Sequence, residues 1–527
     1  MKPADLSQQI AQRWNGRAQS RLDPKQPLCE VECAPDALVE LSSWLFGELN
    51  YSFGGLVVEE GQREWELRYV FYGDRDDGQV QVLVRRPLAE RTIPSISEHV
   101  HAADWHEREV EDHFGLVFEG HPRLGDFVLH DDIWQEDLEP MRRRFDGRRI
   151  VRQGESYLNW WPPCKIVEAP GAFVMPIGPV FSGLAESVHF QLETMGEDII
   201  HFIPRLFYKY RGVEKIAEGR PVEDALLLAE RFCATSAFAH GFAFCQTVEW
   251  ICGAEAPQRA RTLRIFIAEL ERFRHHVAAI EGICESTALS VAASQTALLQ
   301  EELLRLCGAL TGHRYLFGLL APGGLTRDFD DGACRKALAT AQDVLKRLQE
   351  IETMLRFSSS FLDRLEEVGS VSGKEALSHG LVGPVARASG VVRDLRKAQS
   401  YSGYDDFEFD VPAEREGDGY ARLRILFAEA GQSVLIMEQA AGALTAGPVH
   451  TPCSIKSGAA FGLVEAPRGA AFHWVRVNED GTVARYRIMP PSFANWHGLH
   501  FATENFAFQD FPIILATFDL SVAENDR

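Results

Sequence analysis

The sequence lacks several features that would place it in a well-defined functional class. No window holds about 20 uninterrupted apolar residues, the length that spans a bilayer. The first ten residues contain no apolar stretch of the kind found in a signal peptide. No Gly-x-Gly-x-x-Gly follows a strand pattern and no Gly-Lys-Ser/Thr loop occurs, so direct binding of NAD or a nucleotide has no support. We therefore expect a soluble, cytoplasmic chain without direct membrane insertion.

Cysteine is too scattered to form an iron-sulfur site or a disulfide framework. The ten cysteines are spread over 527 residues, and the closest pair, Cys29 and Cys33, is followed by no second pair. Iron-sulfur clusters require sets of thiolates, and isolated cysteines in a long intracellular chain are typically reduced. We expect this chain to bind no cluster of its own.

Positive charge is in deficit. The 54 Lys and Arg residues stand against 76 Asp and Glu, a formal charge of -22, which would repel nucleic acid and anionic lipid. No nucleic-acid partner is expected. The only dense basic segment, residues 141–150, is explained either by a local docking patch or by a solvated linker.

Length and periodicity predict at least two domains. A chain of 527 residues exceeds the size of a single core. An α+β domain is predicted over residues 1–145, because helical spacing over 35–49 precedes two alternating stretches, 65–72 and 79–85, on either side of a turn-rich segment. Pro, Gly and Trp then become frequent, which predicts a linker or extended arm over 146–175.

The remaining segment, 176–527, is predicted to be mainly helical with small antiparallel β elements. Apolar residues recur at spacings of three and four, and two of the helices open with proline. Alternating stretches flank Asp480-Gly481, which indicates a hairpin over 471–488. The expected helices span residues 221–251, 257–280, 293–310 and 334–361.

One motif in the first domain is highly specific. Residues 107–115 read Glu-Arg-Glu-Val-Glu-Asp-His-Phe-Gly, and Phe-Glu-Gly-His-Pro follows at 118–122. This resembles the Glu-Arg-Glu-x-x-Asp-x-Phe-Gly signature of the 30 kDa subunit of respiratory complex I. In relatives of the formate hydrogenlyase large subunit, such a domain precedes a hydrogenase-like domain, which is the order found here.

The second domain resembles the nickel-iron hydrogenase large subunit and the complex I 49 kDa subunit over most of residues 178–527. The resemblance implies a hydrogenase large-subunit-like fold and membership in a multisubunit complex. It also implies a partner subunit that carries an iron-sulfur cluster and integral membrane subunits that hold the protein at the inner face of the cytoplasmic membrane. The matching stretches are 211–215, 257–260, Glu269-Leu270 with Arg272 and His276, 322–324 and 393–397.

The family's nickel site is where the chain departs from this resemblance. Residues 230–236 resemble Glu-Arg-x-Cys-x-x-Cys, with Ser236 at the second cysteine, and residues 519–527 are similar to the closing Asp-Pro-Cys-x-x-Cys-x-x-His/Arg, with Ser521 and Glu524 at its cysteines. Only Cys233 remains of the four nickel ligands. Hydroxyls and a carboxylate cannot replace soft thiolates, so no nickel-iron metal site is expected. Glu524, His240 and Cys233 could hold zinc or ferrous iron only if they converge.

The first and last residues of the closing motif, Asp519 and Arg527, are retained although its cysteines are not. This suggests that the tail still packs into the family's metal pocket. The alternative explanation is a salt bridge from Asp519 to Arg387 or Arg396.

The quinone-site polar groups of the 49 kDa subunit are also replaced. Gly178-Pro179-Val180-Phe181 stands where that subunit has Gly-Pro-Gln-His, and Ala234 corresponds to its tyrosine. Neither Phe181 nor Ala234 offers a side-chain donor to a quinone headgroup. Quinone reduction is therefore weakened but stays open as a function.

Three residues are candidates for chemistry. Glu214 matches a glutamate that resembles a proton relay beside the metal in hydrogenases; burial would raise its pKa, and Arg211 would supply the opposing charge. The alternative is a structural ion pair with Lys215 or another basic neighbour. His240 lies seven residues after Cys233, which predicts one helix face for both, and its alternative is a satisfied core histidine.

These observations lead to three hypotheses. The first is the large subunit of a membrane-associated complex related to complex I and energy-converting hydrogenases, without nickel, coupling electrons from a partner cluster to proton or quinone chemistry. The second is a non-catalytic structural or assembly subunit of such a complex. The third is a working hydrogenase.

Overall fold

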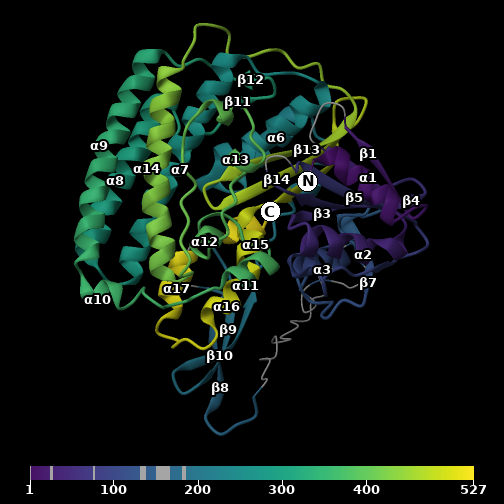
Figure 1. The fold of residues 1–527 in the computed structure, drawn as a ribbon, viewed down its shortest axis with the longest axis horizontal. Coiled ribbons are helices and arrows are strands. Elements are labelled where there is room, and N and C mark those ends of the chain that lie inside the picture. Colours follow the sequence, from purple (N-terminus) through teal and green to yellow (C-terminus); the bar gives the residue numbers. More distant parts are fainter. Residues whose placement is uncertain are drawn as a thin grey trace.

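A computed structural model describes residues 2–23, 28–74, 77–130, 134, 138–149, 167–180 and 186–527. The chain forms an N-terminal β-rich domain beside a larger helical one, and the long helices lie on the side away from the N-terminal domain (Figure 1). A small sheet projects from one end of the molecule (Figure 1). The predicted fold class, an α+β domain followed by a mainly helical domain with small antiparallel sheets, is confirmed.

The N-terminal domain is built on a five-stranded sheet of order β1-β2-β5-β4-β3, in which only β2 and β5 are parallel. The predicted hairpin is confirmed, with Tyr72 opposite Gln79 and Leu67 opposite Val84. Helix α1 (Pro3–Arg13) packs on β1. The strands are β1 (Ala18–Leu22), β2 (Leu28–Cys33), β3 (Ser52–Glu60), β4 (Glu64–Tyr72) and β5 (Gln79–Pro87).

The helix predicted over 35–49 is instead three short helical segments in succession. A 3-10 turn (Pro35–Ala37) leads into α2 (Leu38–Ser43), which ends in a π turn (Trp44–Glu48). The motif at 107–115 forms α3 (Asp104–Phe114), and Gly115 ends it with a φ of 69°. Short strands β6 (Thr92–Pro94) and β7 (Val117–Glu119) pair in parallel. The specific motif therefore lies on a largely buried helix of this domain.

The stretch predicted as a linker ends in a strand. Part of it, residues 150–166, lies outside the described residues, but β8 (Ala172–Ile177) pairs with β9 (His189–Met195), which pairs in turn with β10 (Asp198–Arg205). This sheet is the projection seen in Figure 1. Within the basic segment, Arg142 is buried and contacts Glu60 and Glu139 at 2.8 Å each, so this residue is structural rather than solvated.

The helical domain differs from prediction at one important place. The helix expected over 221–251 is two helices, α5 (Val222–Arg231) and α6 (Ala237–Cys252), separated by Cys233 in extended conformation and a 3-10 turn (Ala234–Ser236). Both helices bury their apolar residues in the same core, so the apolar spacing continues across the break and could not reveal it.

The other predicted helices are confirmed, with ends shifted by a few residues. They are α7 (Gln258–Ser286), α8 (Ser290–Thr311) and α9 (Asp331–Arg356), and α14 (Gly419–Gly442) packs along α7. The shorter elements are α4 (Val213–Ala217), α10 (Ser359–Leu362), α11 (Gly373–Ser378), α12 (Gly383–Ala388), α13 (Leu395–Ala398), α15 (Pro491–His497), α16 (Leu499–Thr503), α17 (Phe511–Phe518), α18 (Val522–Asn525), β11 (Leu320–Ala321) and β12 (Gly324–Leu325).

A second three-stranded sheet joins the two domains. The predicted hairpin is confirmed as β14 (Gly469–Val477) and β15 (Val483–Met489), and β13 (Gly458–Ala466) extends it. Successive residues of β3 and β4 point to opposite faces. One face of these strands packs in the N-terminal core, whereas Val57, Val70 and Tyr72 on the other face pack against Phe472 and Trp474. The domains therefore share a continuous apolar interface.

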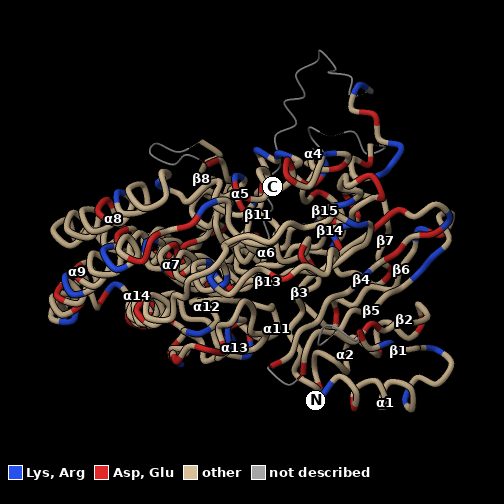
Figure 2. Tube along the Cα trace, turned by 90° about the horizontal axis from the view of Figure 1, so that it is seen from above, with Lys and Arg blue, Asp and Glu red and all other residues tan. Residues whose placement is uncertain are grey.

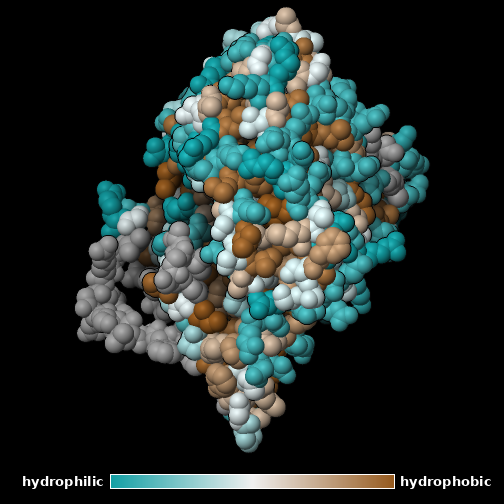
Figure 3. Space-filling view, turned by 90° about the vertical axis from the view of Figure 1, so that its left-hand side faces the viewer, coloured by the Kyte–Doolittle hydropathy of each residue, from teal (hydrophilic) through white to brown (hydrophobic). Residues whose placement is uncertain are grey.

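Charge and hydrophobicity are mixed over the surface. Acidic and basic residues are interspersed along both domains (Figure 2). On the side of the long helices, hydrophobic residues form small patches within a largely hydrophilic surface (Figure 3). Across the described ranges, no helix combines the length and hydrophobicity needed to cross a membrane.

Candidate functional site

The C-terminal tail is buried against the loop that carries Cys233. Ser521 caps α18 by accepting a hydrogen bond from the Glu524 backbone N–H at 3.2 Å. Glu524, Asn525 and Arg527 are fully buried. Arg211 donates to the backbone carbonyls of Ala523 and Asp526, and also to that of Phe232. Arg211 thereby ties the tail to the end of α5.

Cys233 faces Ser521 and Glu524, the tail residues predicted to stand at nickel-ligand positions. Its Sγ lies 3.5 Å from Oε1 of Glu524, 3.8 Å from Oγ of Ser521 and 3.3 Å from Oγ1 of Thr235. Burial and the charge of Glu524 raise the pKa of the Cys233 thiol to about 11. The surviving cysteine is therefore a neutral thiol at pH 7, and it donates toward the carboxylate rather than acting as a thiolate ligand.

Glu524 is an ionised carboxylate satisfied by the protein itself. Its Oε2 accepts from the Ser492 backbone N–H at 3.1 Å, and its Oε1 lies 3.5 Å from a guanidinium nitrogen of Arg468. Burial alone would raise the pKa of Glu524, but His240, Arg468 and the side chain of Ser492 outweigh it and lower this pKa to about 2. Glu524, predicted to stand at the family's fourth cysteine, thus forms one half of a buried ion pair.

Arg468 connects the Cys233 pocket to Asp519 and, through Asp519, to His275 on α7. Its guanidinium donates to Thr235 Oγ1 at 2.9 Å and to the Asp519 backbone carbonyl at 2.5 Å, and it lies 3.4 Å from the Asp519 carboxylate. His275 approaches the other carboxylate oxygen of Asp519 at 3.3 Å. The expected pairing of Asp519 with Arg387 or Arg396 is wrong, because those residues bind other carboxylates. Their partners are Glu429, Glu465 and Asp394 for Arg387, and Asp394 and Glu269 for Arg396.

The donors of this pocket do not fit a nickel-iron centre. Such a centre needs several thiolates, whereas the four positions carry one neutral thiol, two hydroxyls and a carboxylate already held by Arg468. Ser236 is fully buried, and its hydroxyl has no hydrogen-bond partner within the described part of the chain. Nor do the described residues contain a group of three or more His, Cys, Asp or Glu side chains arranged to hold a metal ion.

His240 belongs to a buried chain of titratable side chains. The predicted shared helix face with Cys233 is wrong, because α6 begins only at Ala237. Instead, His240 Nε2 lies 3.7 Å from Glu524 Oε1, and His240 Nδ1 lies 3.0 Å from His473 Nε2. The Tyr486 hydroxyl lies 2.7 Å from His473 Nδ1. All four side chains are fully buried.

The ionised Glu524 selects one arrangement of protons in this chain. A carboxylate can only accept, so the favoured tautomer of His240 carries its proton on Nε2. His240 Nδ1 then accepts from His473 Nε2–H, and His473 Nδ1 accepts from the hydroxyl of Tyr486. Donors therefore point from Tyr486 toward Glu524, the order that a proton relay requires.

Glu214 lies in a separate charge cluster at the domain junction. Its Oε1 accepts from Arg487 at 3.2 Å, from Arg527 at 3.3 Å and from the Ile488 backbone N–H at 2.9 Å, while Arg485 approaches Oε2 at 3.5 Å. Burial raises its pKa, but the three guanidinium groups more than offset this and the pKa of Glu214 is lowered. The expected rise in its pKa is therefore wrong.

The partners predicted for Glu214 are also different. Arg211 binds carbonyls and Lys215 binds Glu218, so neither supplies the opposing charge. The charge comes from β15 and from Arg527. The alternative of a structural ion pair with another basic neighbour agrees with these contacts.

Glu109 of the N-terminal domain completes this cluster. It accepts two hydrogen bonds from Arg487, at 2.8 and 2.6 Å, and two from Arg527, at 2.8 and 3.1 Å. Prediction missed Glu109, Arg468, His473 and Tyr486. For Glu109 a signal existed, because it belongs to the specific motif of α3. Buried polar residues on strands and turns leave no periodic pattern, which explains the other three.

The quinone-related positions are only partly described. Phe181 lies outside the described residues. Ala234 lies in the turn between α5 and α6 and is partly exposed, next to the exposed Thr235. The surface beside Cys233 therefore presents a methyl group where the family has a tyrosine.

Comparison with known families agrees with this architecture. Residues 31–151 match the 30 kDa subunit of respiratory-chain NADH dehydrogenase. Residues 211–280 match nickel-dependent hydrogenase, and residues 295–457 and 449–527 match the 49 kDa subunit of respiratory-chain NADH dehydrogenase.

Individual relatives extend over most of the chain. Formate hydrogenlyase subunit 5 of Escherichia coli (strain K12) is 30% identical over 437 residues, which cover 82% of this chain and 77% of the relative. Hydrogenase-4 component G of the same organism is 29% identical over 440 residues, covering 83% and 76%. The C/D subunit of NADH-quinone oxidoreductase from Bdellovibrio bacteriovorus is 27% identical over 505 residues, covering 88% of each.

Proposed function

We propose that this chain works without a nickel-iron centre. The chain belongs to the family of formate hydrogenlyase subunit 5, hydrogenase-4 component G and the C/D subunit of NADH-quinone oxidoreductase. It is a subunit of a complex I-like or hydrogenase-related assembly. In this proposal it is the large subunit, receives electrons from an iron-sulfur cluster in a partner subunit, and couples them to proton or quinone chemistry.

The observation that carries the proposal is the buried contact between Glu524, Cys233 and Arg468. The carboxylate neutralises Arg468 and accepts from the thiol, with Cys233 Sγ at 3.5 Å and the nearest Arg468 nitrogen at 3.5 Å. A metal ion entering here would have to displace Arg468 and deprotonate a thiol whose pKa is about 11. Both requirements oppose metal binding.

Proton handling is supported by the chain from Tyr486 to Glu524. Its hydrogen bonds of 2.7 and 3.0 Å form a directed series, and the last gap, 3.7 Å between His240 and Glu524, is slightly too long for a hydrogen bond. A small movement of either side chain would close it. We therefore assign His240 the role of delivering a proton to, or taking one from, this pocket.

Attachment to the membrane belongs, in this proposal, to other subunits of the complex. In the proposal, integral membrane subunits hold the chain at the inner face of the cytoplasmic membrane. The similarity to the C/D subunit of NADH-quinone oxidoreductase supports this arrangement. The replaced groups at Phe181 and Ala234 weaken a quinone role for this chain alone.

Metal analysis of the purified complex tests the main proposal. We expect no stoichiometric nickel and no hydrogen uptake with an artificial dye. A triple variant, Ser236→Cys with Ser521→Cys and Glu524→Cys, restores the four thiols and serves as the comparison. Stoichiometric nickel together with hydrogen uptake in the unmodified complex would establish a working hydrogenase and refute the proposal.

A second candidate function, a scaffold without chemistry, is favoured by the Glu214 cluster. Three arginines hold this carboxylate ionised, as in a structural ion pair. His240→Gln separates the two functions, with the exposed Glu223→Gln as the control. Loss of electron or proton flux per assembled complex in His240→Gln alone supports coupling, whereas unchanged flux supports the scaffold.

A further inference from the structure

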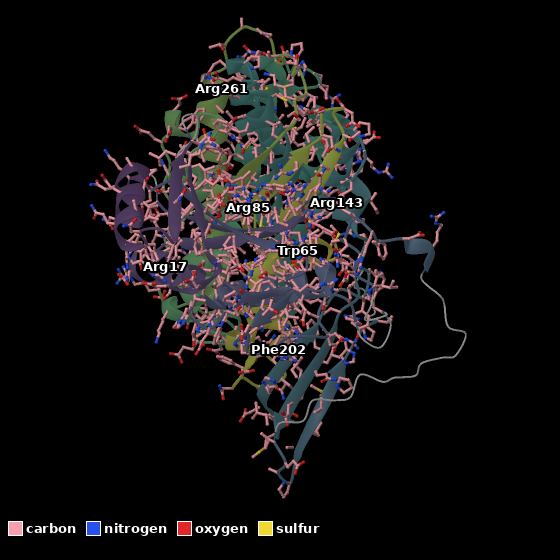
Figure 4. The ribbon with its side chains drawn as sticks, turned by 90° about the vertical axis from the view of Figure 1, so that its right-hand side faces the viewer. Arg17, Trp65, Arg85, Arg143, Phe202 and Arg261 are labelled. Atoms are coloured by element: carbon pink, nitrogen blue, oxygen red, sulfur yellow. The ribbon has the colours of Figure 1, made fainter. Side chains whose placement is uncertain are left out.

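A cavity of about 470 Å³ lies at the junction of the N-terminal domain and the projecting sheet, away from the Cys233 pocket. Its walls come from the start of α3, the loop that follows β7, strand β10, and α15 with α16. Phe202, on β10, lies below the N-terminal domain where this sheet meets the rest of the molecule (Figure 4). The volume is within the range of small-molecule sites, about 300–1,000 Å³.

The carboxylates that line the cavity already have partners. Asp104 is approached by His121 at 3.0 Å and by His497 at 3.2 Å. Asp126 is paired with Arg205 at 3.5 Å, and Glu504 with His201 at 3.0 Å. Each of these carboxylates thus has a contact within 4.0 Å, and none of these contacts is with Arg108 or Arg123.

Arg108 and Arg123 lack such partners. Arg108 is 7% exposed, yet its guanidinium donates only to the backbone carbonyls of Gly125 and Asp126, at 3.2 and 3.3 Å. In the part of the chain that is described, its Nε has no hydrogen-bond partner, and neither arginine is within 4.0 Å of a carboxylate. Burial lowers the pKa of Arg108 and the nearby charge of Arg123 lowers it further, while the charges of Asp104, Asp112 and Asp126 offset this only in part. Two close guanidinium groups without a carboxylate partner therefore border one cavity.

Part of the remaining wall is aromatic. Trp105, Phe202 and Trp496 line the cavity and are 8%, 3% and 2% exposed. Phe127 packs under Arg108, with its ring centre 4.3 Å from the guanidinium carbon, and holds that group in place. The cavity thus combines a fixed cationic end with apolar surface.

We propose that this cavity binds a small organic phosphate ester, with Arg108 and Arg123 on the phosphate and the aromatic walls against its organic part. Guanidinium groups form paired hydrogen bonds with phosphate oxygens. A phosphate monoester carries a charge of about -1.5 to -2 at neutral pH, which matches two arginines without carboxylate partners. Soluble phosphate esters and phospholipid headgroups share this chemistry.

Titration calorimetry of the full-length chain tests this site, with phenyl phosphate as the probe for a soluble ester and phosphatidylglycerol vesicles as the probe for a lipid headgroup. We expect saturable binding of phenyl phosphate that weakens at least tenfold in Arg108→Met and in Arg123→Met. Arg123 is exposed, so its variant stays informative if Arg108→Met fails to fold. Arg305→Met, on the exposed side of α8 with 75% of its side chain accessible, is the control.

The possible results of this titration either support the site or rule it out. Phenyl phosphate binding that depends on both arginines supports a soluble ester, and vesicle binding that depends on them supports a headgroup; either sustains the site. No saturable binding of either probe up to about 10 mM, or an equal loss in Arg305→Met, overturns it. The result is independent of nickel and hydrogen uptake, so it leaves the proposed function untouched.

Discussion

The carboxylate of Glu524 is expected to stabilise the fold through its ion pair, in place of a metal. Glu524→Gln keeps the size of the side chain and removes its charge. Glu524 is fully buried with Arg468 as its cationic partner. Removing one member of a buried ion pair costs about 3–5 kcal/mol when its partner is left uncompensated. Because Arg468 also lies 3.4 Å from the Asp519 carboxylate, we expect the lower end of this range.

The pKa of Glu524 gives an independent magnitude. Its folded value of about 2 lies below the ordinary 4.5, and a depression of this size corresponds to about 3 kcal/mol at pH 7. Because the folded pKa is the lower one, the unfolded chain binds the proton more tightly. The contribution is therefore present above pH 4.5, falls to roughly half at pH 3, and is lost as pH falls through 2.

Thermal unfolding of the wild type and Glu524→Gln, followed by calorimetry, measures this effect. For a chain of this length the unfolding entropy is about 1.1 kcal/mol per K, so we expect a Tm lower by about 3 °C at pH 7. The difference should narrow steadily between pH 5 and pH 3. Glu223→Gln, exposed on α5, should leave Tm unchanged at every pH. An unchanged Tm in Glu524→Gln, or a difference that does not vary with pH, refutes the reasoning.

Three further predictions address the surrounding groups. Arg487→Gln breaks the pairing with Glu109 across the domain junction and should lower stability by about 3–5 kcal/mol, seen as faster limited proteolysis between the domains; cleavage at the wild-type rate would contradict a structural role. Tyr486→Phe removes the donor at one end of the histidine chain, so the ¹⁵N shifts of the histidine side chains should report a changed tautomer population. Identical spectra would argue against a directed chain. Cys233, buried and with a pKa of about 11, should resist iodoacetamide at pH 7 until the protein unfolds, and rapid labelling of the native protein would show a thiolate instead.

Helices and strands could be predicted from the sequence wherever a single apolar periodicity corresponds to a single buried face. The hairpin of β4 and β5 followed from alternation, and α7, α8 and α9 followed from apolar spacing. The break between α5 and α6 did not, because both helices bury apolar residues in one core. The consequence for function is direct, since that break positions Cys233 toward the tail.

The site residues could likewise be predicted only in part. Glu214 and His240 could be named from motifs, but their partners could not. Cys233 and Glu524 are 291 positions apart, and Glu109 and Arg527 are 418 apart. Contacts at such separations depend on how helices and sheets pack, which no local spacing encodes.

The sequence by itself determined the order of the two domains and the family motifs, and it predicted the replacement of three thiolates, because these depend only on which residue stands where. The tertiary structure decided that Glu524 meets Arg468 and Cys233, and that three arginines surround Glu214 and lower its pKa. The physical reason is that the charge state of a buried carboxylate depends on the guanidinium groups within a few ångströms, and packing alone brings those groups together.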